Sequence, residues 1–460
     1  NQTSGAVSTF LKFLKYSFLI TFLLRHVLPR RRPSPACARN TSLLTMATSS
    51  AQPDLVVGPT RTLSLAHLIN ATANRTLETS DLRYFSVIDV SQHPEWSPRA
   101  GTRLLFFARR SVRGQPGAPH VLRSLSTWML APSASNNRLE LLSEAPSVND
   151  YALASNLEVF LAGSMLLGLG GHHLGWDERR GYSKLGRHES NGRRLRPRDG
   201  LHLLKGTRLA DVLSGAWLPW SQFIPADITT PAESAAVTAR KASIIIDGRH
   251  PGCSERFNRY APTCYFDSKM SLARFKGKFL VFARANTVER GGGRFVQVAE
   301  SAGDDPGGPY GRFEMITIEG YTDIRSGNIY TAVVREHPLE PRMLLGLFSV
   351  NEGQPGRVNK DGKCYIALSL SCDGRRWSRL VPLIPTAGEK GRTFDQPVGG
   401  LVRRGASVHF YVQRDVPQIS AAAPTESRLE RYTFRGSALR QLTAAAKARI
   451  CPWAYRLNRL

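Results

Sequence analysis

Five acidic residues stand beside strand-like apolar runs, where a carboxyl group could take part in acid–base chemistry. They are Asp150, Asp267, Asp323, Glu336 and Asp395. Two carboxyl groups act as general acid and general base when one is kept protonated and the other is kept charged. Each of these residues can equally cap the turn at which a strand begins. Which interpretation holds depends on the elements that carry them.

From about Tyr84 onward the sequence consists of short apolar runs, rich in β-branched and aromatic residues and separated by Gly, Pro, Asp and Asn. This pattern is typical of β-strands. The run 101–110 resembles 277–285, and 405–414 is a looser third copy. Such self-similarity predicts four-stranded units stacked around an axis, because one unit cannot bury its own faces. We therefore expect an all-β chain with a five-bladed β-propeller over 84–435, and a pair of β-sandwiches is the alternative.

The organisation of the chain follows from the same pattern. The five units are expected to begin near Tyr84, Asn149, Phe266, Thr322 and Phe394. We expect a linker over 54–83 and, in the long second unit, a polar insertion near 177–245. Helical periodicity predicts a helix over 438–450, within a C-terminal tail over 436–460, and a weaker one at 207–213.

A strand-like run over 365–370 is followed by Ser371, Asp373, Gly374 and Trp377 in the spacing Ser-x-Asp-Gly-x-x-Trp. The Asp and Gly favour a tight turn whose carboxylate accepts backbone N–H bonds, while the Trp packs back on the hairpin. This turn resembles the Asp-box-type turn of sialidase-like and five-bladed glycosidase propellers. Together with the strand pattern, it makes residues 84–435 similar to the arabinanase, xylosidase and invertase group of glycoside hydrolases.

The resemblance implies three acidic residues from different blades that project into a central funnel, with carboxyl groups about 5–9 Å apart. Asp150, Asp267 and Asp323 lead successive expected units. On this basis Asp150 is the base or nucleophile, Asp267 an orienting carboxylate, and Asp323 or Glu336 the acid. The Asn-Asp-Pro-Asn-Gly and Arg-Asp-Pro strings of the invertase branch are absent. Two functions therefore stay open, an O-glycosyl hydrolase and a catalytically inactive propeller that binds glycans or a protein.

Four further residues, together with Asp395, are candidates for substrate binding. Arg284 and Asn286 end an expected inner strand, where they could hold a carboxylate or sulfate on a sugar, or else form an ion pair between blades. His172 follows a glycine run that could line a funnel, and Asp395 leads the last unit. Trp176 could stack on a sugar ring or belong to the core. Metal-ligand and dinucleotide-loop spacings are not found, so we expect no metal and no cofactor.

The chain of 460 residues carries 62 Lys and Arg against 36 Asp and Glu, a formal net charge of +26, and only 12 of the basic residues are Lys. This balance indicates either attraction to an anionic polymer or an arginine-rich codon bias. Eight basic residues gather in 179–198, as a solvated loop or as a contact for an anionic polysaccharide. Because no nucleic-acid-binding motif accompanies them, we expect a carbohydrate ligand, no nucleic-acid partner and a monomer.

Residues 1–53 are typical of a targeting segment. They contain no acidic residue, and a basic region precedes the short apolar stretch 16–24, as in a signal peptide or signal-anchor, with an organelle transit peptide as the competitor. Glycosylation sequons favour the secretory pathway, for a secreted or membrane-anchored glycoprotein. They lie at Asn40, Asn70 and Asn74.

Composition excludes several protein classes. An apolar content of 42% excludes wholesale disorder, and six cysteines in this length exclude a disulfide-stapled mini-protein. A multi-span membrane protein is excluded because no apolar run reaches eighteen residues. Cys253 and Cys264 flank a short loop that a disulfide could close, and two reduced thiols are the alternative.

Overall fold

The computed structural model divides the chain into two compact units, residues 1–53 and 54–460, and the residues that it describes all belong to the second unit. They are 55–65, 80–99, 101–113, 121–130, 139–145, 156–172, 200–220, 244–247, 266, 269–286, 294–321, 327–352, 364–386, 393–417 and 427–451.

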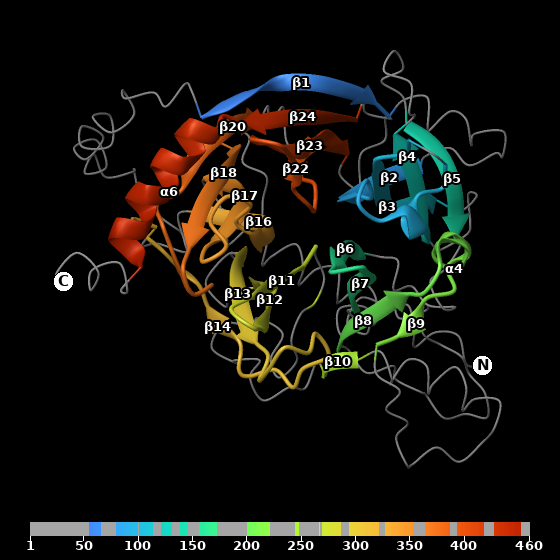
Figure 1. Ribbon diagram of the computed structural model, residues 1–460, viewed down its shortest axis with the longest axis horizontal. Helices are drawn as coiled ribbons and strands as arrows, with labels where there is room; N and C mark the ends of the chain where they lie inside the picture. Colours follow the sequence, from blue (N-terminus) through green and yellow to red (C-terminus); the bar gives the residue numbers. More distant parts are fainter. Residues whose placement is uncertain are drawn as a thin grey trace, which may run out of the picture. The chain divides into compact units, whose positions relative to one another are not determined.

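Five β-sheets stand around a common axis and form a five-bladed propeller (Figure 1). Blade 1 contains β2 (Ser80–Asp89), β3 (Leu104–Arg113), β4 (Val121–Leu130) and β5 (Leu139–Ala145), with a 3-10 helix, η2 (Pro94–Trp96), between β2 and β3. Blade 2 contains β6 (Glu158–Ala162), β7 (Met165–His172), β8 (Gly200–Gly206), β9 (Leu218–Pro219) and β10 (Ile244–Asp247), and the helix α4 (Leu209–Ser214) follows β8. Blade 3 contains β11 (Ser271–Phe275), β12 (Lys278–Asn286), β13 (Arg294–Glu300) and β14 (Glu314–Met315).

Blade 4 is the widest sheet, and blade 5 contains both the first and the last described strand. Blade 4 contains β15 (Thr317–Ile318), β16 (Gly327–Glu336), β17 (Leu344–Glu352), β18 (Cys364–Ser371), β19 (Arg376–Trp377) and β20 (Val381–Thr386). Blade 5 contains β1 (Val56–Ser64), β21 (Thr393–Pro397), β22 (Val402–Arg404), β23 (Ser407–Pro417) and β24 (Arg428–Phe434). The predicted five-bladed all-β architecture is therefore confirmed.

The ring is closed by β1, which pairs antiparallel with β24 as the outermost strand of blade 5. This differs from the expected linker over 54–83. The Gly58-Pro59 step argues against a strand in the sequence, because proline cannot donate to a ladder. The structure accommodates it at an edge, where the register shifts between Val57 and Arg61. Leu63 is fully buried beyond this irregularity.

Part of the expected polar insertion near 177–245 belongs to the propeller. Strand β8 pairs with β7 along its whole length, and Leu201 and Leu203 are completely buried. Leu201 and Leu203 lie in one apolar layer and Leu204 in another, as in a strand whose two faces meet different neighbours. The described residues 200–220 are therefore the outer part of blade 2.

The core consists of apolar layers between neighbouring blades. One layer joins Phe282 of blade 3 to Phe348 and Trp377 of blade 4, and another joins Phe106 of blade 1 to Tyr411 of blade 5. The Phe106 and Tyr411 rings meet edge to face at 5.3 Å between centroids. Each sheet thus buries its faces against two other sheets, which is why the repeated units require the closed ring.

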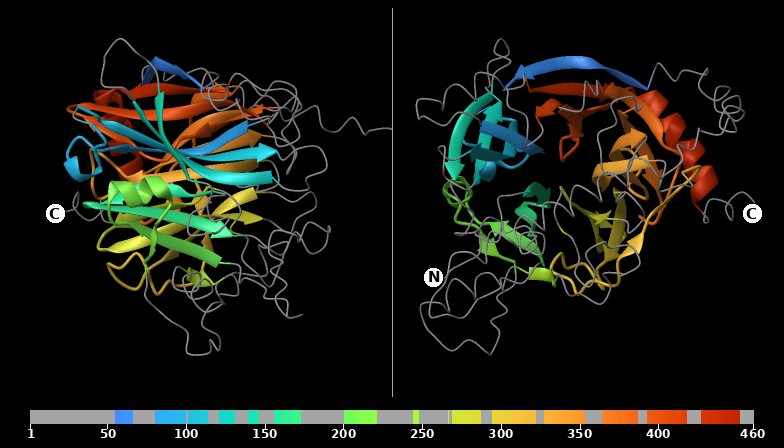
Figure 2. Two further views of the ribbon diagram at one scale, coloured as in Figure 1. Left: turned by 90° about the vertical axis from the view of Figure 1, so that its right-hand side faces the viewer. Right: turned by 180° about the vertical axis from the view of Figure 1, so that it is seen from behind.

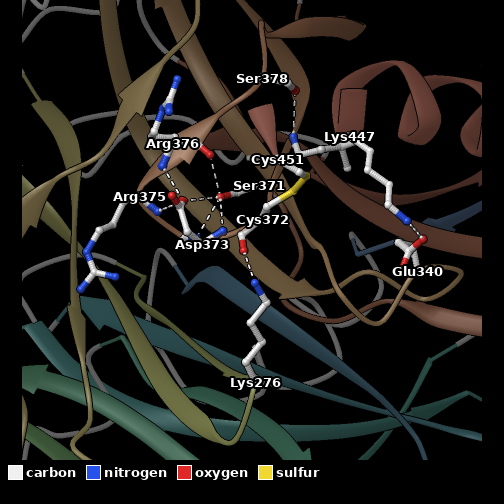
Figure 3. Close-up of a disulfide and its surroundings, with 12 residues drawn as sticks. Lys276, Glu340, Ser371, Cys372, Asp373, Arg375, Arg376, Ser378, Lys447 and Cys451 are labelled. Carbon is white, nitrogen blue, oxygen red and sulfur yellow. Dashed lines mark hydrogen bonds and ion pairs between the residues drawn. A yellow bond between two sulfur atoms is a disulfide. The ribbon is translucent and has the colours of Figure 1, made fainter. Parts of the chain in front are cut away.

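The turn after β18 has the hydrogen bonds predicted from its sequence (Figure 3). The Asp373 carboxylate accepts the backbone N–H groups of Arg375 and Arg376 at 2.8 and 2.7 Å. Gly374 has φ +77°, a left-handed conformation that favours glycine. Trp377 is 1% exposed and donates its indole N–H to the carbonyl of Gly374 at 3.0 Å.

A C-terminal helix, α6 (Gly436–Ile450), packs against blades 4 and 5 and confirms the helix expected over 438–450. Its buried residues recur every three or four positions, at Leu439, Thr443, Ala446 and Ile450. A disulfide between Cys372 and Cys451 joins the Asp-box-type turn to the residue after this helix (Figure 3). This pair was missed by sequence analysis, which considered only Cys253 and Cys264, and both of those lie outside the described residues.

Candidate functional site

The innermost strands bring buried polar side chains together on the axis of the ring, here called the axial cluster. Its members come from four blades and are Ser86 (β2), Glu158 (β6), Lys269 and Ser271 (before and at the start of β11) and Arg335 (β16). Lys269 of blade 3 donates a hydrogen bond to Phe85 of blade 1, and Arg335 of blade 4 donates one to Glu158 of blade 2. Because these blades are not neighbours, such contacts can only cross the axis (Figure 1).

Glu158 is the anion of the axial cluster, and its side chain has no exposed area. One carboxylate oxygen pairs with the guanidinium of Arg335. The other lies 3.3 Å from the hydroxyl of Ser271, whose oxygen also accepts the backbone N–H of Val334 at 3.1 Å. Arg335 is held in addition by a bond to the carbonyl of Val334 at 2.7 Å. The cluster therefore contains a buried ion pair with satisfied partners, whose disruption is costly.

Lys269 is the second cation of the axial cluster. Its ammonium group donates to the carbonyl of Phe85 and lies 3.3 Å from the hydroxyl oxygen of Ser86. One carboxylate faces two cations, of which Lys269 is the more deeply buried. Burial accordingly lowers the pKa of Lys269 to about 7; Glu158 opposes this shift and Arg335 adds to it. Lys269 is thus the member that exchanges a proton near neutral pH.

Blade 5 completes the axial cluster with a glycine. A Cβ atom on Gly399 would lie 2.9 Å from the Lys269 side chain and 3.2 Å from a Glu158 carboxylate oxygen. The backbone N–H of Gly399 donates to the carbonyl of Phe85 at 2.8 Å, and its own carbonyl accepts from Val87 at 2.6 Å. Close approach of this backbone to the charged side chains therefore requires a residue without a side chain.

Raising the pH from 7 to 8.5 is expected to increase the free energy of unfolding by about 1.5 kcal/mol through Lys269. The folded-state pKa is lowered to about 7 from the ordinary value of 10.5. The unfolded chain therefore binds more protons across this window, and stability rises with pH. Urea unfolding of Lys269→Met should lack this rise, whereas the exposed Lys278→Met should keep it. An equal rise in both variants would contradict the assignment.

A second set of polar residues fastens three of the blades to the next one around the ring. On the second strands of blades 1, 4 and 5, a buried polar residue reaches the inner strand region of the following blade. The bonds run from Arg109 to Asn156 at 2.9 Å, from Ser349 to the carbonyl of Asp395 at 3.0 Å, and from Gln413 to the carbonyl of Leu82 at 2.7 Å. Arg109 and Gln413 occupy equivalent places in the repeated runs seen in the sequence.

Most of the predicted site residues lie outside the described parts of the chain. Among the catalytic candidates these are Asp150, Asp267 and Asp323, and among the binding candidates Trp176. His172 and Asn286 are described as the last residues of β7 and β12, and their side chains are outside the description. These assignments stay predictions.

The topology nevertheless shows which strand ends lie at the same end of the ring. The inner strands β2, β6, β11, β16 and β21 start from one end of the ring, here called the upper end, and Ser86 and Gly399 pair in parallel across blades 1 and 5. Seen from the side, the strands run from end to end of the ring (Figure 2). The second strands return to the upper end, where His172 and Asn286 end β7 and β12. The connections before β6 and β11 therefore begin and end at this same end, and the connection before β16 ends there.

Asp395 and Arg284 are both described and both buried, at 3% and 7% exposure. The Asp395 carboxylate pairs with Arg414 at 2.9 Å and accepts the backbone N–H of Asp415 at 2.8 Å. Burial raises the pKa of Asp395 to about 6, against the charge of Arg414. Asp395 is thus anchored within its own blade.

Arg284 sits on β12 at the position equivalent to Arg109, which fastens blade 1 to blade 2.

Glu336 lies away from the upper end. It is the last residue of β16, whose ten residues start at Gly327 and span about 30 Å. Burial raises the pKa of Glu336, and the charge of Arg274 on β11 opposes this shift. Two carboxyl groups that cleave one glycosidic bond are within about 10 Å of each other. The structure places Glu336 at the end of β16 that is opposite the starting ends of the inner strands.

Sequence analysis missed the charged members of the axial cluster. Glu158 starts β6 eight residues after Asp150, which the search for acids at unit starts selected instead. A usable signal was present, because Glu158 lies within an apolar run and Arg335 directly follows one. Charges on a strand buried on both faces need partners, and the sequence could not show that these partners sit on opposite blades.

Comparison with known proteins gives a likeness of architecture. No protein-family model and no curated protein matches the sequence. Solved structures that resemble the chain include a family 117 glycoside hydrolase of the marine bacterium Zobellia galactanivorans, with 11% identity, a TM-score of 0.38, and coverage of 79% of this chain and 86% of that chain. An alpha-L-arabinofuranosidase of Podospora anserina shows 11% identity, a TM-score of 0.41, and coverage of 79% and 92%. The catalytic domain of a GH62 alpha-L-arabinofuranosidase of Coprinopsis cinerea shows 10% identity, a TM-score of 0.41, and coverage of 79% and 93%.

Proposed function

We propose that this chain is a glycosidase-type propeller that acts on a polysaccharide at the upper end of its ring. The observation that carries this proposal is the shared starting end of the five inner strands. In this proposal Asp150 is the base or nucleophile, Asp267 the orienting carboxylate and Asp323 the acid. These residues precede β6, β11 and β16, on three successive blades. Glycoside cleavage requires such carboxyl groups from separate elements to meet across one bond.

A catalytically inactive glycan-binding propeller is the second candidate, and one observation favours it. The two acids that the structure describes on the inner strands near the axis, Glu158 and Asp395, are each paired with an arginine. Each of these carboxylates is already bound by a side chain of the protein, and breaking such a buried pair is costly. The activity therefore depends on the three aspartates before the strands.

An anionic substrate is part of the proposal. The described region above the axial cluster contains Arg83 and Arg109 on blade 1 and Arg284 on blade 3, each less than 8% exposed. A sugar carboxylate or sulfate suits guanidinium groups, which bind such anions through two parallel bonds. The formal net charge of +26 would in addition raise the rate of encounter with an anionic polymer.

Residence in the secretory pathway, secreted or membrane-anchored, is likewise proposed. Support comes from the disulfide between Cys372 and Cys451, because disulfides form and persist in oxidising compartments. The sequons at Asn40, Asn70 and Asn74 fit the same compartment. Within the described ranges, neither α4 nor α6 has the length and apolar character that a bilayer-crossing helix needs.

The test compares release of reducing ends from neutral and uronic-acid-containing polysaccharides by the wild type and by matched variants. Asp267→Asn and Asp323→Asn are expected to lower turnover at least about a hundredfold, the usual contribution of general acid–base groups. Glu336→Gln, at the opposite end of the strand that follows Asp323, is the control and should retain full turnover.

Three outcomes separate the two functions. Turnover lost in the aspartate variants and kept in Glu336→Gln supports the glycosidase. Saturable glycan binding by calorimetry without turnover supports the inactive binding propeller. Neither turnover nor binding on any of the polysaccharides would overturn both.

A further inference from the structure

The face of blade 5 that meets blade 1 carries a group of basic residues, here called the junction cluster. Its members are Arg61 (β1), Arg404 (β22), His409 (β23) and Arg431 (β24). The strand register places them on one side of the sheet. Arg431 is the direct partner of both Arg61 and Tyr411, and His409 is the partner of Val402, two residues before Arg404. Side chains two residues apart on a strand point to the same face.

This face turns toward blade 1. Tyr411 and Val402 belong to the apolar layer that also contains Phe106 and Trp128 of blade 1, and the Tyr411 ring meets the Phe106 ring. Trp128 is the strand partner of Phe106, one strand farther from the axis. Arg431 is one strand farther from the axis than Tyr411. Trp128 and Arg431 therefore occupy corresponding positions on the two facing blades, each one strand farther from the axis than the contact between the Phe106 and Tyr411 rings.

Within the described part of the chain, two arginines of the junction cluster, Arg404 and Arg431, lack matching negative charge. Among the described residues, no carboxylate forms an ion pair with Arg404 or Arg431. Like charges directly opposite on neighbouring strands, as in Arg61 and Arg431, destabilise a sheet. Burial lowers the pKa of Arg61, and Arg431 and Arg404 lower it further. The bonds that Arg431 does make are to neutral oxygens, the Thr60 hydroxyl at 3.1 Å and the Tyr411 hydroxyl.

Blade 1 adds a donor on the facing side. Trp128 is 2% exposed, and its indole N–H, which is buried, has no hydrogen-bond partner in the described part of the structure. A buried donor left without an acceptor costs about 1–3 kcal/mol. Indole and guanidinium groups donate hydrogen bonds and cannot accept them. A ligand that satisfies both must therefore supply several acceptor oxygens and negative charge.

We propose that the junction between blades 1 and 5 binds an oxyanion, the sulfate, phosphate or carboxylate group of a ligand, through Arg404, Arg431 and Trp128. Arg61 contributes a further positive charge on the first strand of the ring. The bound oxyanion connects β1, β24 and the β22–β23 hairpin of blade 5 with β4 of blade 1. Because β1 and β24 close the ring, the ligand stabilises the closure of the propeller. This site is separate from the polysaccharide site proposed at the upper end.

The test uses inorganic sulfate as the probe and the full chain as the protein. Thermal unfolding is followed at millimolar sulfate, with chloride added to hold the ionic strength constant. Binding to the folded state alone is expected to raise Tm by at least about 2 °C near saturation. Arg404→Gln and Trp128→Phe should each weaken sulfate binding at least about tenfold by calorimetry, the loss of one bond to a charged group.

The control is Arg403→Gln. Arg403 is the neighbour of Arg404 on the same hairpin but points to the other face, and it donates to the carbonyls of Gly405 and Pro338. This variant should bind sulfate as the wild type does. Arg404 is partly exposed on a turn, so Arg404→Gln is expected to fold. Sulfate binding that is absent from the wild type, or that is lost equally in Arg403→Gln and Arg404→Gln, would overturn the proposal.

Two further ligands distinguish the source of the oxyanion. Inorganic phosphate that competes with sulfate supports a site for free oxyanions. A sulfated oligosaccharide that binds more tightly than its desulfated form, and loses this preference in Arg404→Gln, supports a sulfate carried by a glycan. Equal binding of the sulfated and desulfated forms, together with no effect of phosphate, would overturn the site.

Discussion

Glu158→Gln is expected to lower the free energy of unfolding by about 3–5 kcal/mol, the usual cost of removing one partner of a buried ion pair. The substitution keeps the size of the side chain and removes its charge. Arg335, whose side chain is only 15% exposed, then lacks its counter-ion, and Lys269 loses the negative charge that favours its protonated form. Urea unfolding followed by circular dichroism at pH 7 measures the change.

One control variant and one double variant test whether the loss of stability comes from the ion pair. Glu336→Gln removes an exposed carboxylate one residue from Arg335 and should change stability by less than about 0.5 kcal/mol. The double variant Glu158→Gln/Arg335→Met should recover much of the loss, because it removes the stranded charge as well. A single variant as stable as the wild type, or a double variant with no recovery, would show that the two side chains are not an energetic pair.

Cys451→Ser is expected to lower the free energy of unfolding by about 4–5 kcal/mol, because the disulfide with Cys372 closes a loop of 79 residues and loop closure restricts the unfolded chain. The same bond holds the end of α6 against the Asp-box-type turn of blade 4 (Figure 3). The loss should appear as a lower urea midpoint under oxidising conditions.

Reduction provides the matched control for this cross-link. The double variant Cys372→Ser/Cys451→Ser should be about as stable as Cys451→Ser, since each lacks the same bond. A reducing agent should lower the midpoint of the wild type to that of the variants and leave the variants unchanged. A wild-type midpoint that does not respond to reduction would contradict the stabilising role of the disulfide.

Local features of the fold could be predicted from the sequence. The Asp-box-type turn depends on residues within seven positions of one another, from Ser371 to Trp377, and the hydrogen bonds that shape the turn lie inside that window. The repeated run around Phe106 and Phe282 indicated a strand of a repeated unit, because alternation and turn residues are local properties. The structure makes it the second strand of a blade, and not the inner strand expected for the run that ends at Arg284 and Asn286. The number of blades followed from counting these units.

The site could be predicted only in part. The search for acids at strand starts led to Asp150, Asp267 and Asp323, whose roles stay predictions. It also led to Asp395, which the structure anchors to Arg414 within blade 5, and to Glu336, which it places at the far end of β16. The direction of a strand decides at which end of the ring a residue lies. This direction is known only once the topology of the sheet is known.

The sequence by itself determined the strand content, the turn chemistry, the C-terminal helix and the five repeated units, because short-range periodicity and turn residues specify them. Only the tertiary structure decided that β1 closes the ring on β24 and that Glu158 meets Arg335, 177 residues away, on the axis. The same holds for the basic junction between blades 1 and 5. The physical reason is that these contacts join strands from separate blades. Which buried charges face each other is decided only when the ring closes.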